Sequence, residues 1–157
     1  MGKTTEKTDS QPLGAGWIAG QFALFALVAT AAFFGPSWPW QPEMRIAGAI
    51  VAAFAVVLFA AGIVALGSAL TPFPRPRGQL VERGPFALVR HPIYGGVLLG
   101  LFGVSLISRP LALLTTFASV VFLTLKTRHE ERLLREAVAG YGEYCERVRR
   151  RFIPFVF

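Results

Sequence analysis

The sequence predicts an all-α integral membrane protein with about four transmembrane helices and a cytoplasmic helical segment at its C-terminus. Of its 157 residues, 54% are hydrophobic, which is high for a soluble domain. These residues gather in runs, and residues 17–42 and 46–74 contain no charged side chain. The net charge is +7, and the basic residues flank the apolar runs. That arrangement is typical of membrane topology, so we expect membrane lipids as partners and no nucleic acid.

The first predicted helix follows a polar N-terminal tail. Residues 1–16 are polar, and we expect them to be disordered. As a helix, the uncharged run 17–34 is about 27 Å long, which barely crosses a hydrocarbon core of about 30 Å. A cleaved signal peptide is the alternative, since Lys3 and Lys7 precede the run and residues 29–31 resemble a cleavage site. A retained helix is favoured because more apolar runs follow.

The second predicted helix, 46–70, is the clearest membrane span in the chain. Residues 35–45, which precede it, contain three prolines and the tryptophans Trp38 and Trp40. Proline interrupts helices and tryptophan favours the membrane interface, so this segment is predicted to be a short external loop. Residues 17–70 therefore form one unit of two transmembrane helices.

The third and fourth predicted helices, 93–108 and 110–126, are separated by Arg109 and Pro110. Each is short for a full crossing, but helix ends can extend and an arginine can reach the interface. Gly96, Gly100 and Gly103 fall on one face of the third helix. Small residues on one face let a helix or a ligand approach the backbone closely, and helix packing is the favoured interpretation.

The C-terminal part is predicted to leave the membrane. Residues 126–138 continue the fourth helix, with the charged pairs Glu131–Arg135 and Arg132–Glu136 at i, i+4 spacing. A short amphipathic segment follows Gly140, and the tail 149–157 is basic and then apolar, which suits docking on the membrane surface or against the protein. The single cysteine excludes an intramolecular disulfide and a Cys-rich metal site, and we expect no metal.

Arginine placement predicts the topology. The connector 71–92 carries four arginines against one glutamate, whereas the loops 35–45 and 108–110 carry one arginine each. The positive-inside rule then places both termini in the cytoplasm, and we expect a bacterial inner-membrane location. The connector and the C-terminal segment share that face, so residues 71–157 form a second unit in which a composite site can be built.

The stretch from Gly84 to Gly96 concentrates the reactive side chains. The residue before a proline avoids helical angles and proline suits a first helical turn, so His91 should end a loop and Pro92 should open a helix. Arg90, His91 and Tyr94 then surround a helix N-terminus, where unpaired N–H groups carry partial positive charge. Such a group can hold a ligand with a carboxylate or hydroxyls. The alternative is interfacial anchoring by Arg90 and His91, and residue types alone favour neither.

Several segments, taken in order, resemble the isoprenylcysteine carboxyl methyltransferase family and its relatives among the phospholipid methyltransferases. They are residues 80–86 (LVERGPF), residues 89–96 (VRHPIYGG), Glu130–Glu131 with Leu134, the region of Tyr141 and Tyr144, and residues 151–154 (RFIP). The resemblance covers roughly residues 64–157. It implies a small all-helical membrane methyltransferase core at 71–157, with S-adenosyl-L-methionine bound in a pocket that faces the cytoplasm.

The resemblance also implies roles for individual residues. The implied cofactor-binding residues are His91, Pro92, Tyr94, Gly95, Tyr141 and Tyr144. The implied catalytic residues are Arg90, Glu130, Glu131 and Arg151. The two arginines would orient a carboxylate nucleophile, and the glutamates would approach from the opposite side, facing the cofactor's ammonium or ribose hydroxyls. The chain departs from the family pattern at Arg150, where many members have proline, and in the spacing of its tyrosines, which leaves the register of residues 141–151 open.

Three functions remain open at this level. The first is methylation of a lipophilic small molecule or lipidated substrate, resembling carboxyl O-methylation of isoprenylcysteine. The second is N-methylation of a phospholipid headgroup, in which a glutamate or histidine would accept the amine proton. The third is a non-catalytic membrane module on the same scaffold. For Glu130 and Glu131 the alternative is a solvated helix face, and the resemblance favours the site. The methyl acceptor and the oligomeric state do not follow from the sequence.

Overall fold

The computed structural model describes residues 11–67 and 80–153, and all regular secondary structure within them is helical. Its elements are α1 (Gln11–Ala31), α2 (Gln41–Leu66), the 3-10 helix η2 (Gly84–Ala87), α3 (Pro92–Ile107), α4 (Pro110–Ala137) and α5 (Tyr141–Arg147). The described residues contain no strand. The predicted all-α class is therefore confirmed.

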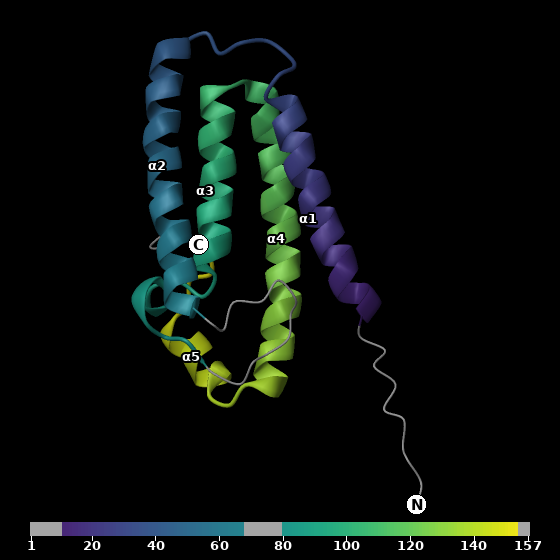
Figure 1. Cartoon of the computed structure of the whole chain (residues 1–157), viewed down its shortest axis with the longest axis vertical. Coiled ribbons are helices and arrows are strands. Elements are labelled where there is room, and N and C mark those ends of the chain that lie inside the picture. Colours follow the sequence, from purple (N-terminus) through teal and green to yellow (C-terminus); the bar gives the residue numbers. More distant parts are fainter. Residues whose placement is uncertain (1–10, 68–79, 154–157) are drawn as a thin grey trace, which may run out of the picture.

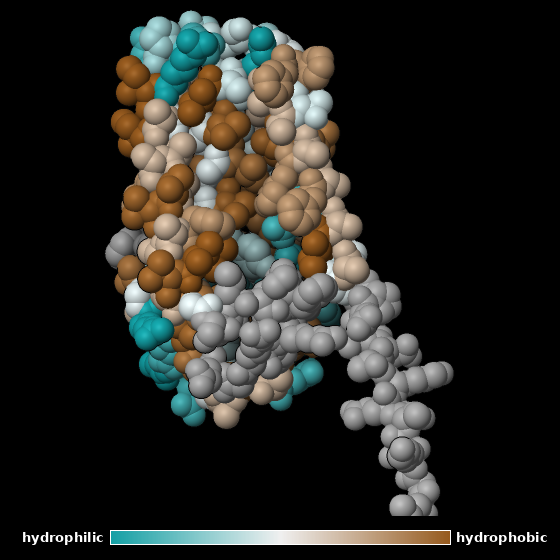
Figure 2. All heavy atoms as spheres, viewed as in Figure 1, coloured by the Kyte–Doolittle hydropathy of each residue, from teal (hydrophilic) through white to brown (hydrophobic). Residues whose placement is uncertain are grey.

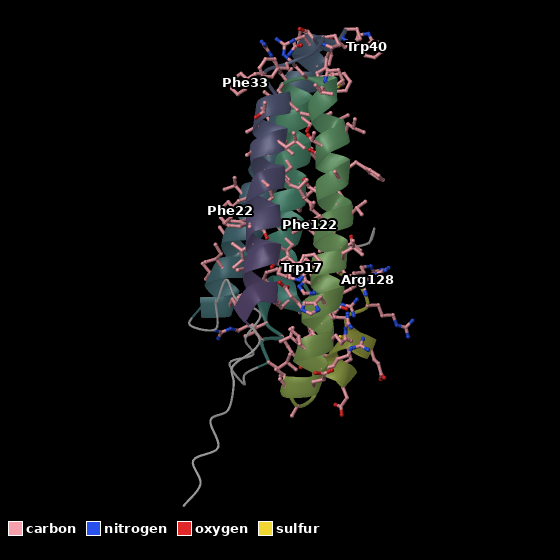
Figure 3. All side chains as sticks on the ribbon, turned by 90° about the vertical axis from the view of Figure 1, so that its right-hand side faces the viewer. Trp17, Phe22, Phe33, Trp40, Phe122 and Arg128 are labelled. Atoms are coloured by element: carbon pink, nitrogen blue, oxygen red, sulfur yellow. The ribbon has the colours of Figure 1, made fainter. Side chains whose placement is uncertain are left out.

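The four long helices form an up-and-down bundle in which consecutive helices run in opposite directions (Figure 1). α3 lies between α2 and α4, and α1 packs along the other side of α4. On that side, the Trp17 ring lies 5.3 Å from the Phe122 ring and stacks on His129 (Figure 3). The start of α1, η2, α5 and the end of α4 lie toward one end of the bundle, and the α1–α2 loop and the α3–α4 turn lie at the other (Figure 1).

Three helices, α1, α2 and α4, are long and apolar enough to cross a membrane. α3 has 16 residues and is about 24 Å long, so it falls short of a standard span although it lies beside them. Apolar side chains dominate the visible face between the two ends (Figure 2), and large hydrophobic residues such as Val64 and Phe117 are strongly exposed. The fold is that of an all-α membrane protein.

Two helix starts differ from the sequence predictions. α1 begins at Gln11, inside the tail predicted to be disordered, and α2 begins at Gln41, inside the predicted loop. Each helix has a proline in its first two positions, where the missing N–H costs nothing, so these prolines open helices instead of interrupting them. α1 ends at Ala31, three residues before the predicted end. The predictions for residues 1–10, 68–79 and 154–157 lie outside the described residues.

The glycines of α3 mediate packing against α2. A Cβ on Gly96 would lie 2.8 Å from the backbone nitrogen of Phe59, and a Cβ on Gly103 would lie 2.9 Å from that of Ala52. Neither position accepts a side chain without moving the helix backbone opposite. Gly100 has only an ordinary 3.9 Å contact, to Ala55. The helix-packing interpretation is confirmed for the two outer glycines.

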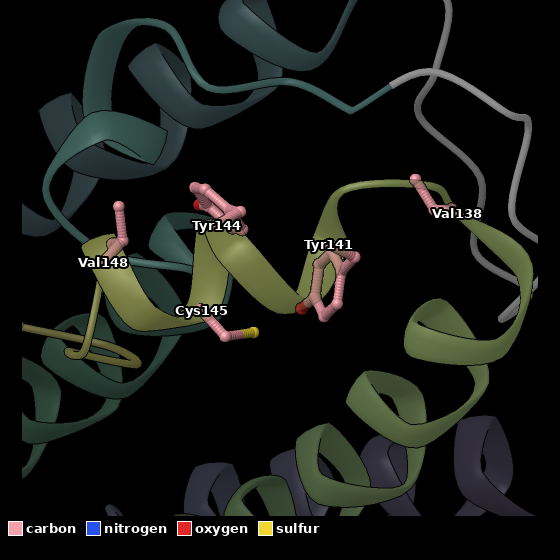
Figure 4. Packing of buried hydrophobic residues seen from close by; sticks show 5 residues of the cluster. All are labelled: Val138, Tyr141, Tyr144, Cys145 and Val148. Carbon is pink, nitrogen blue, oxygen red and sulfur yellow. The ribbon is translucent and has the colours of Figure 1, made fainter.

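α4 continues beyond its uncharged part, which ends at Leu125, and carries a polar extension to Ala137, as predicted. Gly140 then turns the chain with a positive φ of 79°. α5 packs into a buried cluster (Figure 4) whose members are Val138, Tyr141, Tyr144, Cys145 and Val148. The Tyr144 hydroxyl donates a hydrogen bond of 2.8 Å to the carbonyl of Phe86 in η2. This bond ties the C-terminal segment to the loop that precedes α3.

Candidate functional site

The loop before α3 is bound to the C-terminal tail through the backbone. The amide of Arg90 donates to the carbonyl of Arg150 at 2.9 Å, and the amide of His91 donates to that of Arg151 at 2.7 Å. A Cβ on Gly95 would lie 2.1 Å from the carbonyl oxygen of Phe152, so this position must be glycine for the tail to lie where it does. These contacts bring the side chains at positions 90, 91 and 151 together although they are about 60 residues apart.

Glu131 is the centre of that group. Its side chain is only 5% exposed, and its Oε1 lies 3.2 Å from Arg90 Nε, 3.2 Å from His91 Nε2 and 3.3 Å from Arg151 Nε. Arg151 Nη2 also donates to Oε2 at 3.3 Å. We refer to Arg90, His91, Glu131 and Arg151 as the Glu131 cluster. Its members come from the loop before α3, the polar extension of α4 and the tail.

The predicted i, i+4 pairs of α4 are not formed within the part of the chain described. Glu131 turns toward the loop and the tail instead of toward Arg135, which is exposed. The interpretation of this glutamate as part of a solvated helix face is therefore wrong. The physical reason is that one buried and one partly buried guanidinium outweigh one exposed helix pair, which contributes about 0.3–0.5 kcal/mol.

The ionisation of Glu131 follows from these contacts. Burial by itself would raise the pKa of this carboxyl. Hydrogen bonds from His91 and Arg151, with the charges of His91 and Arg90, outweigh burial and lower the pKa to about 2. Glu131 lies about 9 Å beyond Leu125 along the helix, outside the uncharged part of α4. It is therefore an anion at neutral pH and a weak proton acceptor.

The guanidinium group of Arg90 has a buried N–H donor without a hydrogen bond. Its Nη2 donates to the carbonyl of Arg149 at 3.3 Å, but its buried Nε has no hydrogen bond of acceptable geometry despite lying 3.2 Å from Glu131 Oε1. The cluster holds two guanidinium groups against one carboxylate. A buried donor without an acceptor costs about 1–3 kcal/mol, so the cluster has the capacity for a further anionic group.

Glu130 organises a second, adjacent group. The Tyr94 hydroxyl donates to Glu130 Oε1 at 2.9 Å, and Lys126 Nζ lies 3.8 Å from the same oxygen. Lys126 also lies over the Tyr94 ring, 5.0 Å from its centroid, and donates to Gln21 of α1 at 2.6 Å. The His91 ring stacks on Tyr94 at 5.9 Å, which connects the two groups. Neighbouring glutamates thus serve different partners, as their separation of about 100° around the helix requires.

The structure brings together most of the residues that the sequence selected. Pro92 is buried at the start of α3, next to the Glu131 cluster. Tyr141 and Tyr144 instead lie in the packed cluster of α5, where burial raises the pKa of both phenols. Sequence reasoning did not select Lys126 or Gln21. Two sequence features could have pointed to them: Gln21 is a lone amide within an uncharged run, and Lys126 lies one helical turn before Glu130.

Comparison with known proteins places the chain in a family. The family model described as phospholipid methyltransferase matches residues 44–140, which is more than half of the chain and runs from the first turn of α2 to Gly140. This family includes the isoprenylcysteine carboxyl methyltransferases. The chain is also similar to the cobalt-zinc-cadmium resistance protein CzcN of Cupriavidus metallidurans, with 35% identity over 75 residues. That alignment covers 46% of this chain and 35% of CzcN, so the chain spans about a third of that relative's length. From the family match, the chain belongs to the phospholipid methyltransferase family.

Proposed function

We propose that this protein transfers a methyl group from S-adenosyl-L-methionine to a carboxylate on a lipophilic acceptor, in a reaction resembling carboxyl O-methylation of isoprenylcysteine. The observation that carries the proposal is the Glu131 cluster, in which two guanidinium groups share one carboxylate and the buried Arg90 Nε, although paired with Glu131, makes no hydrogen bond of acceptable geometry. Family membership supports the reaction class. The apolar, strongly exposed helices support an acceptor that reaches the site from the membrane.

The residues present fit the cofactor. When bound, S-adenosyl-L-methionine supplies an electrophilic methyl group on a sulfonium sulfur. Glu130, which already accepts a hydrogen bond from Tyr94, would hold the cofactor's ammonium or ribose hydroxyls. The rings of His91 and Tyr94, stacked at 5.9 Å, offer an aromatic surface beside this carboxylate. Pro92 and Gly95 keep the backbone of the loop close to the tail, next to these groups.

Arg90 and Arg151 would orient the acceptor carboxylate through paired N–H bonds, as guanidinium groups do for planar anions. Glu131 acts on both arginines as a positioning residue, since it contacts each of them at 3.2–3.3 Å. A carboxylate nucleophile needs no general base, so the task of the chain is orientation. Alignment of this kind can supply roughly 7–11 kcal/mol of the barrier in favourable cases.

N-methylation of a phospholipid headgroup is the second candidate, favoured by the description of the matched family. An amine nucleophile must lose a proton, and Glu131 is a poor acceptor because its pKa is about 2. Glu130 would have to take that role. The cationic surplus of the Glu131 cluster suits a carboxylate better than an ammonium, which is why O-methylation is our first proposal.

Calorimetric titration of the purified full chain with S-adenosylhomocysteine tests the cofactor site. We expect binding, and we expect His91→Ala and Tyr94→Phe to weaken it by about tenfold, the loss of one good hydrogen bond or ring contact. Arg128→Gln, an exposed change about 160° around α4 from Glu130, is the control and should bind like wild type. Absence of binding at millimolar concentration would favour the non-catalytic module.

Turnover with labelled S-adenosyl-L-methionine separates the two acceptor classes. A prenylcysteine acceptor should yield a methyl ester, which releases volatile methanol in base, whereas an N-methylated headgroup is stable in base. Label that remains base-stable in an extracted phospholipid would replace our first proposal with the second. Label in neither acceptor, from a protein that binds the cofactor, would show that the acceptor belongs to another class.

A further inference from the structure

A second polar site lies at the opposite end of the bundle from the Glu131 cluster. A cavity of about 340 Å³ opens there among the end of α1, the α1–α2 loop, the first turns of α2 and the α3–α4 turn. It is lined by Ala32, Ser37, Gln41, Arg45, Ile107, Ser108 and Arg109. Two of these residues are arginines and none is acidic, so the lining is cationic. Figure 2 shows hydrophilic residues gathered at this end of the molecule.

The walls of the cavity are held in place by long-range hydrogen bonds. Trp38 Nε1 donates to the carbonyl of Ser105 at 3.1 Å, and Gln41 Nε2 donates to that of Ile107 at 3.3 Å. Arg109 donates to the carbonyl of Gly35 and lies 3.4 Å from Ser37 Oγ. These bonds join the α1–α2 loop to both sides of the α3–α4 turn. They fix the backbone around the cavity and hold the Arg109 side chain in place.

Gln41, one of the residues that line the cavity, has unused hydrogen-bonding capacity. The buried Oε1 of Gln41 has no hydrogen-bond donor among the described residues. The N-cap residues Trp40 and Arg109 make no side-chain cap for α2 or α4, so the first-turn N–H groups of two long helices lack that partner. Helix N-termini favour anions, and arginine and serine donors suit phosphate oxygens. The occupant should thus combine an anion with a neighbouring hydrogen-bond donor, which the Gln41 oxygen would accept.

The position of the cavity identifies the kind of occupant. Phe33, Phe34 and Trp40 surround this end of the bundle and are 63–78% exposed (Figure 3). Exposed aromatic residues at the end of transmembrane helices mark the level of lipid headgroups. Glu43 does not line the cavity, and it is about 200° around α2 from both Gln41 and Arg45. An anion at this depth is most directly supplied by the bilayer itself.

We propose that this cavity binds the phosphodiester headgroup of a glycerophospholipid, with Arg45 and Arg109 on the phosphate and Gln41 Oε1 accepting from a headgroup hydroxyl. The site is separate from the methyl-transfer site at the other end of the bundle and does not depend on the proposed function. Its occupant is a structural or regulatory lipid rather than the methyl acceptor.

The test uses the full chain in detergent and short-chain phosphatidylglycerol, a lipid without an amine that could be methylated. Native mass spectrometry would measure retained dioctanoyl-phosphatidylglycerol during titration. We expect Arg45→Gln to weaken binding by about tenfold, the effect of losing one charge-assisted bond. Arg128→Gln removes the same charge at the other end of the bundle and should bind like wild type. Arg45 is exposed and makes no described hydrogen bond, so its replacement should leave the fold intact.

Three further ligands separate the possible sources of the anion. Dioctanoylglycerol, which lacks the phosphate, should bind equally to wild type and Arg45→Gln. Dioctanoyl-phosphatidylmethanol keeps the charge but lacks the hydroxyls, and should bind several-fold more weakly than phosphatidylglycerol. Inorganic phosphate that displaced the lipid at equal concentration would show a free-anion site and overturn the assignment to a lipid. Equal lipid binding by Arg45→Gln and Arg128→Gln would overturn the site altogether.

Discussion

Replacing Glu131 with glutamine tests whether the buried carboxylate organises the candidate site. The change keeps the shape of the side chain but removes the negative charge that faces Arg90, His91 and Arg151. It also places an amide N–H₂ where one carboxylate oxygen was, and that group cannot accept from a guanidinium. The two arginines are then left close together without a counter-charge.

The size of the effect follows from the ionisation of the group. The cluster lowers the pKa of Glu131 from its ordinary value of 4.5 to about 2. Each pKa unit corresponds to about 1.4 kcal/mol, so the charged form is favoured by about 3–4 kcal/mol in the folded state. Removing one partner of a buried ion pair costs a similar amount, roughly 3–5 kcal/mol. We therefore expect Glu131→Gln to lower the Tm of the detergent-solubilised protein by about 10 °C at neutral pH.

The stabilisation has a defined pH window. Because the folded-state pKa lies below the unfolded-state value, the contribution of Glu131 is complete above about pH 5 and is lost as the pH falls toward 2. The difference in stability between wild type and Glu131→Gln should be constant from pH 7 to pH 5. Below about pH 4.5 it should shrink by about 1.4 kcal/mol for each pH unit. Thermal melts of both proteins across pH 3.5–7 measure this difference.

The matched control is Glu136→Gln, an exposed glutamate on the same helix. It should melt within about 2 °C of wild type, since exposed charges contribute little. Methyl transfer by Glu131→Gln should fall by about 10²-fold, because misplacement of orienting groups is that costly. If Glu131→Gln melted and turned over like Glu136→Gln, the buried cluster would have no energetic role and the reasoning would fail.

Two further predictions follow from the geometry. Gly95→Ala should displace the tail from the start of α3, because its Cβ would meet the backbone carbonyl of Phe152, and should lower the free energy of unfolding by about 1–3 kcal/mol with loss of activity. Gly100→Ala, whose Cβ would make only a 3.9 Å contact, is the control. Equal melting temperatures of the two variants would contradict the close approach of the tail to Gly95. In a Cys145→Ala background, a membrane-impermeant maleimide added to intact cells should label Ser37→Cys and spare Arg135→Cys, since the arginine-rich segments are predicted to be cytoplasmic. The reverse pattern would invert the topology.

Most helices could be predicted from the sequence because a helix depends on residues that are close together in the chain. Backbone groups in a membrane must find partners within their own segment, so uncharged runs such as 46–70 and 110–125 predict helices from composition alone. The continuation of α4 beyond the membrane and its turn at Gly140 were likewise confirmed. The starts of α1 and α2 were wrong because proline signals both a helix interruption and a first helical turn, and a short sequence does not separate these meanings.

The candidate site contains both features that the sequence predicted and contacts that it did not. Two features could be predicted from the residues alone: His91 and Pro92 stand at a helix start, and Glu130 and Glu131 point in different directions. Both depend only on backbone angles within a few residues. The packing of distant segments, by contrast, sets the contacts of Glu131 with Arg90 and Arg151 and the contact of Glu130 with Tyr94. Those contacts join segments 20–41 residues apart and depend on the tail packing against Gly95. Ion pairs between distant segments are set by which backbones pack together, and no local preference encodes that outcome.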